Sequence, residues 1–570
     1  MKTMRVTGRA RRGYPTIGAA LVEATRSLKE ARILIEPGTY DEQLIVRGDV
    51  SLVAREPGSV TIRSAAGPLL DSDGAVRLSG LRFEAAAGEA VLCRGGSLEA
   101  HEIAVETRGQ ITLWAAPGTR VVARSSTFRG GRVLFAGASG TLESCTLRDC
   151  PDNAIAVIEG ARVDVRECRV ERPRHSAVRV EAGSSATITA GRFVSCRDTT
   201  VAVIGAAARA DIAGTIIEDA GTAIGFAEGA TGNVRDVTVR QARHAFSSRS
   251  DANPTVSDCA FLDCGETGIN ISERGAGTFS DCLVRDAGAI GVFIKGDGAD
   301  VGRWGTVDIS RCTVEGSSVG IAVEGAEGRF RGCRLSRLRF AGVRLLGASS
   351  ATFDELSVTD TPVGLDARGT SAGTFSRATV SECHPLAVSA VDEARLRISE
   401  SVVADSGVGA GIQGSASLVV KSSELRDLES FGMIAMATST LVLESSHLLD
   451  PGAIGVIGLH DAFIDVRDTT VKDAADVGFH LLDKCSGQIA GCTVTAATGL
   501  AVTKNDYVRV VGMTSPLRTI ATSSASAKDA VVAQVTNIYN TPIFLKEFSG
   551  QIAMGNGSVE QVQERGGEGR

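Results

Sequence analysis

The chain has 570 residues, and its 60 Lys and Arg against 67 Asp and Glu give a formal net charge of −7. This small acidic excess, without a block of basic residues, disfavours a nucleic-acid-binding or membrane-surface protein. The N-terminal residues form no apolar signal segment. No apolar run reaches the about 18 residues that favour a membrane span, so we expect a cytoplasmic protein.

Residues 1–60 are expected to contain a short basic leader, a capping helix and a first rung of strands. Thr16 stands where the helix would begin, and its hydroxyl can accept a backbone N–H there. The apolar residues that follow at helical spacing would form one face, made of Ile17, Ala20, Leu21, Ala24 and Leu28. Such a helix would cover the open end of a stack of strands.

Residues 61–515 repeat a short motif about every 23 residues, which is the signature of a solenoid. In the copy Leu142-Glu-Ser-Cys145-Thr-Leu147, apolar residues flank two polar or small residues and a Cys. The positions equivalent to Cys145 are 145, 168, 191, 214, 237, 259, 282, 312, 333, 356, 378, 401, 423, 446, 469 and 492. The longer step from 282 to 312 indicates an insertion of about seven residues.

A second strand-like run follows each motif, as in Gly291-Val-Phe-Ile-Lys295. Its alternation of apolar residues indicates a strand, and no unit carries enough of a helical pattern for a crossover helix. This excludes leucine-rich, ankyrin and helical repeats. We therefore predict an all-β fold, a single-stranded right-handed parallel β-helix of about 18–20 rungs with about 22–23 residues in each.

Over roughly residues 14–515 the sequence resembles the right-handed parallel β-helix proteins of the pectate-lyase-like superfamily. Tyr14-Pro-Thr-Ile-Gly-Ala-Ala-Leu21, followed by Ile33-Leu-Ile-Glu-Pro-Gly-Thr-Tyr40, is the part most similar to that family. The chain also resembles actinobacterial β-helix domains found next to AAA+ ATPase modules. The resemblance implies a bacterial protein with an ATPase partner in the same or an adjacent chain, because this sequence has no P-loop motif of its own.

The repeat fades after residue 515, and residues 516–570 are predicted to form a strand-like C-terminal cap and a flexible tail. The runs Val531-Val-Ala-Gln-Val-Thr-Asn-Ile-Tyr539 and Pro542-Ile-Phe-Leu545 are the strand-like part. The last residues, from Glu564 to Arg570, have the composition of a linker, as in a piece of a longer protein.

The 13 Cys residues lie mostly at the repeat position of Cys145, where a small apolar thiol fits an inward ladder. We expect them to be structural and free of disulfides in a reducing compartment. Because the sequence has no CxxC pair or Cys/His cluster, we expect no metal site and no cofactor.

The first candidate binding region is the insertion after Lys295, because a loop added to a regular scaffold often carries function. It would act with outward residues of the neighbouring rungs. The predicted binding residues are Lys295, Asp297, Asp300, Arg303, Trp304, Glu324, Arg344 and Asp366. The alternative is a tolerated surface insertion beside ordinary cross-rung salt bridges.

The second candidate is a group of ionisable residues near the C-terminal end of the repeats. Aligning the rungs stacks His460, Asp483 and Lys504 in one column and Asp461 with Lys484 in the next, and His480 lies on the preceding outward position. His beside Asp beside Lys is a candidate acid–base group, since neighbouring charges shift pKa values. The alternative is a set of corner charges that only stabilises stacked rungs.

The third candidate is an outward apolar stripe of Ile434, Met436, Ile457, Leu459 and Leu482. Apolar residues on the outside of consecutive rungs imply a cover. The tail at 530–548, a second copy or another protein could supply it, and we favour the tail. If the tail lies elsewhere, the stripe is the predicted interface.

A polysaccharide enzyme is disfavoured by the aromatic content of 4%, by the lack of an export signal and by the lack of repeated carboxylate pairs. A recurring Asp, as at Asp149 and Asp263, is interpreted as a turn former. The leading hypothesis is a non-catalytic binding or scaffold module that presents an extended surface to a protein partner, as the recognition domain of a larger ATPase or secretion-linked protein. The alternative is a pectate-lyase-like lyase, hydrolase or isomerase acting on a carbohydrate or peptide-like substrate.

Overall fold

The computed structural model describes residues 2–7, 13–27, 30–65, 67–296, 306–498, 500–504, 507–513 and 518–521. The chain separates into two units, residues 1–519 and 520–570. The second unit is described only at Ile520 and Ala521, so the fold given below is that of the first unit.

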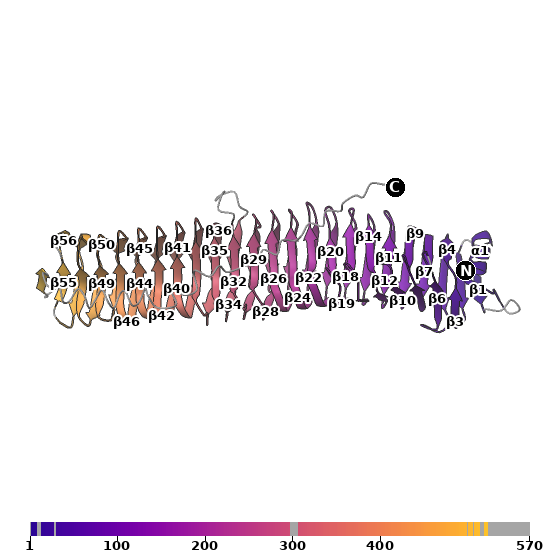
Figure 1. The fold of residues 1–570 in the computed structure, drawn as a ribbon, viewed down its shortest axis with the longest axis horizontal. Helices are drawn as coiled ribbons and strands as arrows, with labels where there is room; N and C mark the ends of the chain where they lie inside the picture. The colour runs from indigo at the N-terminus through magenta and orange to yellow at the C-terminus, as the bar shows by residue number, and fades with distance from the viewer. Residues whose placement is uncertain are drawn as a thin grey trace, which may run out of the picture. The chain divides into compact units, whose positions relative to one another are not determined.

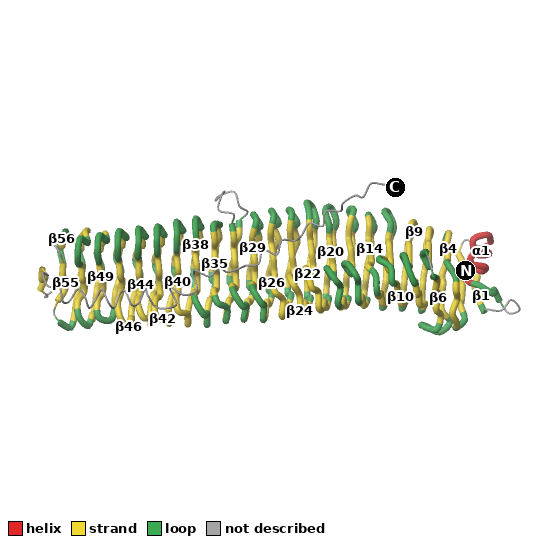
Figure 2. The backbone as a smooth tube through the Cα atoms, in the orientation of Figure 1, coloured by secondary structure: helices red, strands yellow, loops and turns green. Residues whose placement is uncertain are grey.

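The first unit is a parallel β-helix, in agreement with the predicted fold class. Each strand pairs in parallel with the strand one turn before it and the strand one turn after it. Within the described residues these pairings make three ladders, sheets 1, 2 and 3, which the chain visits in that order on every turn (Figures 1 and 2). A full turn therefore has three strand segments, one in each ladder.

The strands that lie wholly in sheet 1 of the described chain include β4 (Leu44–Arg47), β11 (Ile111–Ala115), β14 (Arg132–Ala136), β17 (Ile155–Ile158), β20 (Val178–Val180), β29 (Thr267–Ser272), β32 (Ile290–Lys295), β35 (Val319–Glu324), β38 (Ala341–Leu346), β49 (Ile454–Gly458), β52 (Val477–Leu481) and β55 (Leu500–Lys504).

Sheet 2 contains β1 (Lys2–Val6), β2 (Glu30–Ile35), β5 (Asp49–Ala54), β12 (Arg120–Arg124), β15 (Ser139–Glu143), β18 (Arg162–Arg166), β21 (Ser185–Thr189), β23 (Arg209–Ala213), β25 (Thr231–Arg235), β27 (Asn253–Ser257), β30 (Gly277–Ser280), β33 (Val307–Ser310), β36 (Glu327–Arg331), β39 (Ser350–Asp354), β41 (Ala372–Ser376), β43 (Arg395–Ser399), β45 (Ser417–Lys421), β47 (Thr440–Glu444), β50 (Phe463–Arg467), β53 (Ser486–Ala490) and β56 (Val508–Val511).

Sheet 3 contains β3 (Gly38–Asp41), β6 (Val60–Ser64), β8 (Leu81–Ala85), β10 (Ala104–Thr107), β13 (Thr127–Arg129), β16 (Thr146–Arg148), β19 (Arg169–Glu171), β28 (Ala260–Leu262), β31 (Leu283–Arg285), β34 (Thr313–Glu315), β37 (Arg334–Ser336), β48 (His447–Leu449), β51 (Thr470–Ala474) and β54 (Thr493–Ala496).

Longer strands turn a corner without a break. From sheet 1 into sheet 2 run β7 (Leu70–Ser79) and β9 (Val91–His101). From sheet 3 into sheet 1 run β22 (Arg192–Ile204), β24 (Ile216–Ala227), β26 (Thr238–Arg249), β40 (Ser357–Ala367), β42 (Thr379–Ala390), β44 (Val402–Ile412) and β46 (Glu424–Ala435). The last described strand is β57 (Arg518–Ala521).

The turns depend on single residues in the left-handed backbone conformation. Between sheets 2 and 3 this residue directly precedes the Cys145 position, as at Ser144 with φ 52° and Asp281 with φ 55°. After sheet 3 it is often Asp, which tolerates this conformation better than most residues. The members with φ between 47° and 62° include Asp149, Asp219, Asp263, Asp286, Asp360, Asp405, Asp427, Asp450 and Asp473. These Asp residues are turn formers, as the sequence predicted.

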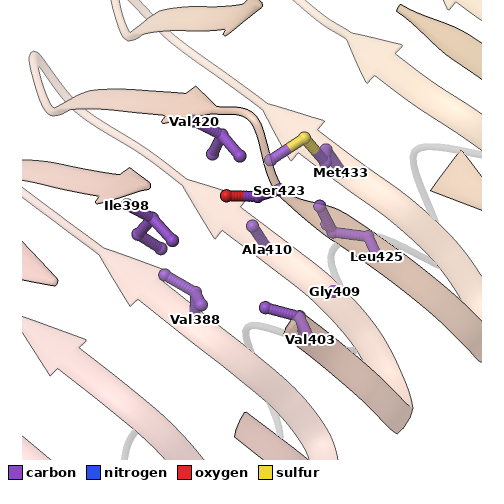
Figure 3. A pocket seen from close by; sticks show the side chains of 9 residues that line it. All are labelled: Val388, Ile398, Val403, Gly409, Ala410, Val420, Ser423, Leu425 and Met433. Atoms are coloured by element: carbon purple, nitrogen blue, oxygen red, sulfur yellow. The ribbon is translucent and has the colours of Figure 1, made fainter. Parts of the chain in front are cut away.

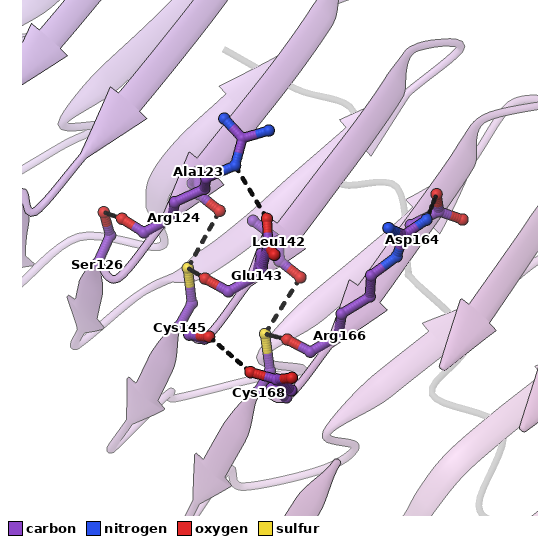
Figure 4. A network of polar contacts seen from close by, with 11 residues as sticks. Ala123, Arg124, Ser126, Leu142, Glu143, Cys145, Asp164, Arg166 and Cys168 are labelled. Carbon is purple, nitrogen blue, oxygen red and sulfur yellow. Dashed lines mark hydrogen bonds and ion pairs between the residues drawn. The ribbon is translucent and has the colours of Figure 1, made fainter. Parts of the chain in front are cut away.

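Where the residue that follows a left-handed residue between sheets 2 and 3 is Cys or Ser, its side chain is buried and bonds to the backbone of the corner. The thiol of Cys145 lies 3.4 Å from the carbonyl oxygens of Ala123 and Glu143, and Cys168 repeats the arrangement one turn later (Figure 4). All 13 Cys are free and buried. The sequence predicted inward packing for this column but not its hydrogen bonds.

Ser occupies the same position on later turns and forms a continuous chain of bonds. The hydroxyl of Ser423 donates to the carbonyl of Lys421 at 2.7 Å and accepts the N–H of Ser401 at 3.2 Å. The N–H of Ser423 in turn donates to the hydroxyl of Ser446 at 3.2 Å. The column therefore satisfies backbone groups at a corner where the strands are interrupted.

The interior is filled by in-register apolar side chains. Phe330, Phe353 and Phe375 stack on three successive turns, with ring centroids 4.6 Å and 4.7 Å apart. A gap of about 10 Å³ lies inside the core, lined by Val388, Ile398, Val403, Gly409, Ala410, Val420, Ser423, Leu425 and Met433 (Figure 3). It has the size of one water molecule at most and Ser423 is its single polar side chain, so it is a packing gap and not a ligand site.

Helix α1 (Ile17–Ser27) covers the N-terminal end, as predicted, and contacts β1, β2 and β4. Ile17, Ala20, Leu21 and Ala24 are buried, whereas Leu28 lies outside the described residues. Thr16 accepts the N–H of Ala19 at 3.1 Å. Glu42 adds a cap that the sequence did not suggest, because its carboxylate accepts the N–H groups of Ile17 and Gly18 at 2.9 Å and 2.7 Å.

Replacing Ser423 tests the corner column. Ser423→Ala should leave the N–H of Ser401 without its acceptor, at a cost of about 1–3 kcal/mol, and Ser423→Cys should cost less. Native-state hydrogen exchange at Ser401 measures the effect, and we expect roughly tenfold or faster exchange in the Ala variant. Ser417→Ala on the outside of sheet 2 is the control. Unchanged exchange at Ser401 in Ser423→Ala would show that the column does not support the corner.

Candidate functional site

One outward position on each turn of sheet 1 forms a continuous column, which we name the outer column. None of its apolar members belongs to the interior core. Register partners on adjacent strands give its order: Ile45, Asp71, Leu92, Trp114, Leu134, Ala156, Arg179, Ala202, Gly225, Ser247, Asn270, Phe293, Ala322, Arg344, Asp366, Ser389, Gly411, Ile434, Ile457, His480 and Thr503. The described members of all three candidates from the sequence lie on or beside this column.

The first candidate forms cross-rung ion pairs. Lys295 and Glu324 face each other on β32 and β35, with Nζ and Oε1 3.7 Å apart. Arg344 Nε lies 3.5 Å from Asp366 Oδ2, and these side chains are only 7% and 4% exposed. Burial lowers the pKa of Arg344 to about 10, although Asp366 opposes that shift. The remaining predicted members, Asp297, Asp300, Arg303 and Trp304, lie outside the described residues.

The apolar stripe is buried in the structure. Ile434, Met436, Ile457, Leu459 and Leu482 are between 0% and 9% exposed, yet they lie outside the interior core. The segment 530–548, which the sequence predicts as a cover, lies outside the described residues, and an interface at the stripe stays a prediction.

Two members of the predicted acid–base group, His460 and Asp483, sit at the corner after sheet 1. His460 and Asp483 both have left-handed backbones, with φ 59° and 57°. The carboxylate of Asp483 accepts the backbone N–H of His460 at 3.2 Å. Asp392 accepts the N–H of Gly369 at 3.1 Å in the same way at an earlier corner.

The register corrects one part of the predicted stacking. Lys504 pairs with Leu481, so it does not share the column of Asp483 as the sequence alignment had it. The alignment needed a turn of 21 residues to place Lys504 after Asp483. The structure keeps the usual 23 residues between Leu481 and Lys504. Asp461 and Lys484, from the neighbouring predicted column, are exposed next to their respective corners.

His480 belongs to the outer column and is buried, with 6% exposure. Its Nδ1 forms a hydrogen bond with the hydroxyl of Thr503. Its Nε2 has no hydrogen-bond partner among the residues that the structure describes. Burial lowers the pKa of His480, and the charge of Asp476 raises it in part. The lowered pKa favours the neutral imidazole at neutral pH.

Sequence reasoning missed a group at the start of the outer column. Trp114 lies between Leu92 and Leu134, and the guanidinium carbon of Arg94 is 5.6 Å from its ring centroid. Arg94 Nε donates to Asp71 at 3.0 Å. Trp114 is one of two Trp in the chain, and this rarity was the available signal.

The described residues offer neither a metal-binding cluster nor a membrane-spanning helix. The described part of the chain contains no group of three His, Cys, Asp or Glu side chains that could hold a metal ion. It also contains no helix with the length and apolar character needed to cross a bilayer. Burial raises the pKa of Cys150 and of Cys383 to about 12, which keeps these thiols protonated.

Comparison with known proteins identifies the repeat. The family model for the "Right handed beta helix region" matches residues 131–301 and 363–514, more than half of the chain. None of the curated proteins compared with the chain matches it.

Several solved structures match the chain at low similarity. The alginate lyase AlyGC of family PL6 is 11% identical, with 90% of this chain and 100% of that chain covered and a TM-score of 0.28. The N-terminal fragment of gene product 12 of bacteriophage Phi29 is 11% identical, with coverages of 87% and 92% and a TM-score of 0.40. The family 28 exopolygalacturonase of Yersinia enterocolitica is 11% identical, with coverages of 60% and 75% and a TM-score of 0.26. Scores this low carry no information on the ligand or chemistry of this chain.

Substitution of Asp483 separates a corner acceptor from a catalytic acid. Asp483→Ala and Asp392→Ala should each lower the free energy of unfolding by about 0.5–2 kcal/mol, as loss of a backbone cap does. Asp483→Asn should have a smaller effect, because the amide oxygen still accepts the N–H. Thermal unfolding followed by circular dichroism gives the comparison. A loss in Asp483→Asn as large as in Asp483→Ala would mean that the charge, and not the corner bond, is required.

His480 should make stability depend on pH. Its pKa in the folded chain lies below the ordinary value of 6.5, so the unfolded chain takes up a proton first as pH falls. The wild type should therefore lose stability more steeply than His480→Gln below about pH 6.5, and the two should run parallel above it. Denaturant midpoints measured across this range check the prediction. Parallel curves throughout would exclude a lowered pKa.

Proposed function

We propose that this chain, which belongs to the family of right-handed β-helix proteins, is a non-catalytic binding module that presents an extended surface to a protein partner. A solenoid displays many side chains at fixed spacing along one face, which suits recognition of an extended polypeptide. An ATPase module in the same or an adjacent chain is the partner class that we propose.

The observation that carries this proposal is the role of Asp483, the acid of the predicted acid–base group, at the corner that contains His460. Asp483 serves the backbone of His460 as Asp392 serves that of Gly369, so the acid in the predicted acid–base group repeats a structural task. A general base has to reach the proton that it removes, and a carboxylate that caps a corner is held for another purpose. His480 is likewise buried beside Thr503.

Reconstitution tests the proposal. The 570-residue chain is immobilised and exposed to extract of its native host, and each captured protein is then purified and titrated against it. Support is saturable binding of one such protein, with the variant His460→Ala/Asp483→Ala/Lys504→Ala binding as tightly as the wild type.

Turnover assays with uronate and glucan oligosaccharides cover the alternative of a carbohydrate-active enzyme. Activity in the wild type that is lost in the triple variant, with an unchanged circular dichroism spectrum, would overturn the proposal. The matched control is Asp392→Ala, which removes an equivalent corner acceptor far from the candidate group.

A further inference from the structure

We infer that residues 531–545 of this chain bind along the outer face of sheet 1 and cover it from β32 to β52. The chain itself then occupies this face, and a partner protein reaches it only where the segment leaves. The inference goes beyond the proposed function and does not depend on it, because it concerns a contact within one chain.

A second column of outward residues lies beside the outer column, three positions earlier on each turn, and is apolar on nine consecutive turns. None of its members belongs to the interior core, yet all are only 0–5% exposed. We name it the second column, and register partners give its order: Ile290, Val319, Ala341, Val363, Leu386, Val408, Phe431, Ile454 and Val477. Apolar residues this well buried on the outside of a sheet require a cover.

The outer column is buried without interruption over the same turns. Every member from Phe293 to Thr503 is buried. Before Phe293 the burial is interrupted, because Trp114 and Asn270 are partly exposed although Leu92 is buried. The two columns together therefore place the continuous cover over the turns from β32 onward.

The cover keeps water from polar groups as well. The side chains of Arg344 and Asp366 are only 7% and 4% exposed. Oγ of Ser389 and Nε2 of His480 are buried and have no hydrogen-bond partner among the residues that the structure describes. On an open sheet face all of these groups would be hydrated.

The cover belongs to the same chain, because these exposed fractions are those of a single chain. The one helix of the described residues, α1, contacts β1, β2 and β4 at the opposite end (Figure 1). The longest internal stretch outside the described residues is 297–305. Its ends join β32 and β33, so it reaches out by about 15 Å, whereas the second column is about 38 Å long at about 4.8 Å per turn. Only residues 522–570 are long enough.

The C-terminal segment starts in the right place. Strand β57 pairs with β55, so the last described residues lie in sheet 1, at the end of the covered face. Residues 531–545 follow after a Ser- and Ala-rich stretch and contain no charged residue, in a chain that is 22% charged. Fully extended, these residues span about 50 Å at about 3.3 Å each, which is enough for the second column.

The segment also has one side that suits an apolar face. Alternate residues of an extended chain point the same way. One set is mostly apolar: Val531, Ala533, Val535, Asn537, Tyr539, Thr541, Ile543 and Leu545. The other set contains Gln534, Thr536 and Asn540. We expect the first set to face sheet 1.

Reaction of an introduced thiol with N-ethylmaleimide tests the inference. Ile457→Cys places a thiol on the covered face of the 570-residue chain, and mass spectrometry follows its modification. The native thiols are buried, so the parent chain is the blank. The thiol of Ile457→Cys should react roughly tenfold or more slowly than that of Ile45→Cys, whose site is 63% exposed on the same column. Ile434→Cys is the second probe if Ile457→Cys does not fold.

A matched pair of segment variants identifies the cover. Val535→Asp/Ile543→Asp should raise the reaction rate of the introduced thiol roughly tenfold, because charge on the apolar set releases the segment. Thr536→Asp/Asn540→Asp adds the same charge to the other set and should leave the rate unchanged.

Three results would overturn the inference. A thiol at position 457 that reacts as fast as one at position 45 means an open face. Equal rates in both segment variants mean that residues 531–545 are not the cover. Protection that is lost on dilution means that a second copy covers the face. The assay contains no partner protein, so its outcome is separate from that of the reconstitution.

Discussion

The fold depends on one constraint: each turn of the chain must end directly above its own start, displaced by one strand spacing along the solenoid axis. Parallel backbone hydrogen bonds hold the turns about 4.8 Å apart, so a change in the length of one turn disturbs both neighbours. The corners make this possible, because they set the direction in which the chain enters the next strand. A single left-handed residue, such as Ser144 or Asp149, changes the direction of the chain, and each such residue is unfavourable by about 1–2 kcal/mol. The bonded column of Cys and Ser beside these residues helps to hold a backbone that would otherwise relax.

Much of this fold could be predicted from the sequence, because in a solenoid the repeat period determines which residues pair on adjacent turns. The spacing of the Cys145 positions gave the register, the strands and the inward side, and the recurring Asp gave one set of corners. The bonds made by Cys145 and Ser423 could not be predicted from residue type, since either side chain is equally explained by packing. Glu42 was missed for another reason: the helix that it caps lies about 25 residues earlier, and no local motif links the two.

The candidate site was predictable in position but not in role. Alignment placed His460 beside Asp483 correctly, and the structure shows that the contact is to the backbone N–H and not to the imidazole. Only backbone geometry distinguishes these two arrangements. The error at Lys504 arose in the last described turn, where the motif is weakest and the register is least constrained by sequence. Trp114 was overlooked because the early turns repeat poorly, so their outward positions could not be aligned.

The outer column changes character along its length, although its backbone geometry is nearly constant. It begins with Ile45, Asp71 and Trp114, passes small residues such as Ala202 and Gly225, and ends among buried residues such as Ile457. On a uniform scaffold only the side chains decide where a ligand can bind, and a buried apolar residue is not available to one. Two arginines share one carboxylate in the first turns, where Arg47 and Arg94 pair with Asp71, and again further along, where Arg344 and Arg368 pair with Asp366. The two places differ in burial, because Asp366 is 4% exposed whereas Ile45 in the first turns is 63% exposed. Ion pairs at exposed positions contribute little to stability, so burial of the side chains distinguishes one part of the column from another more than their charge does.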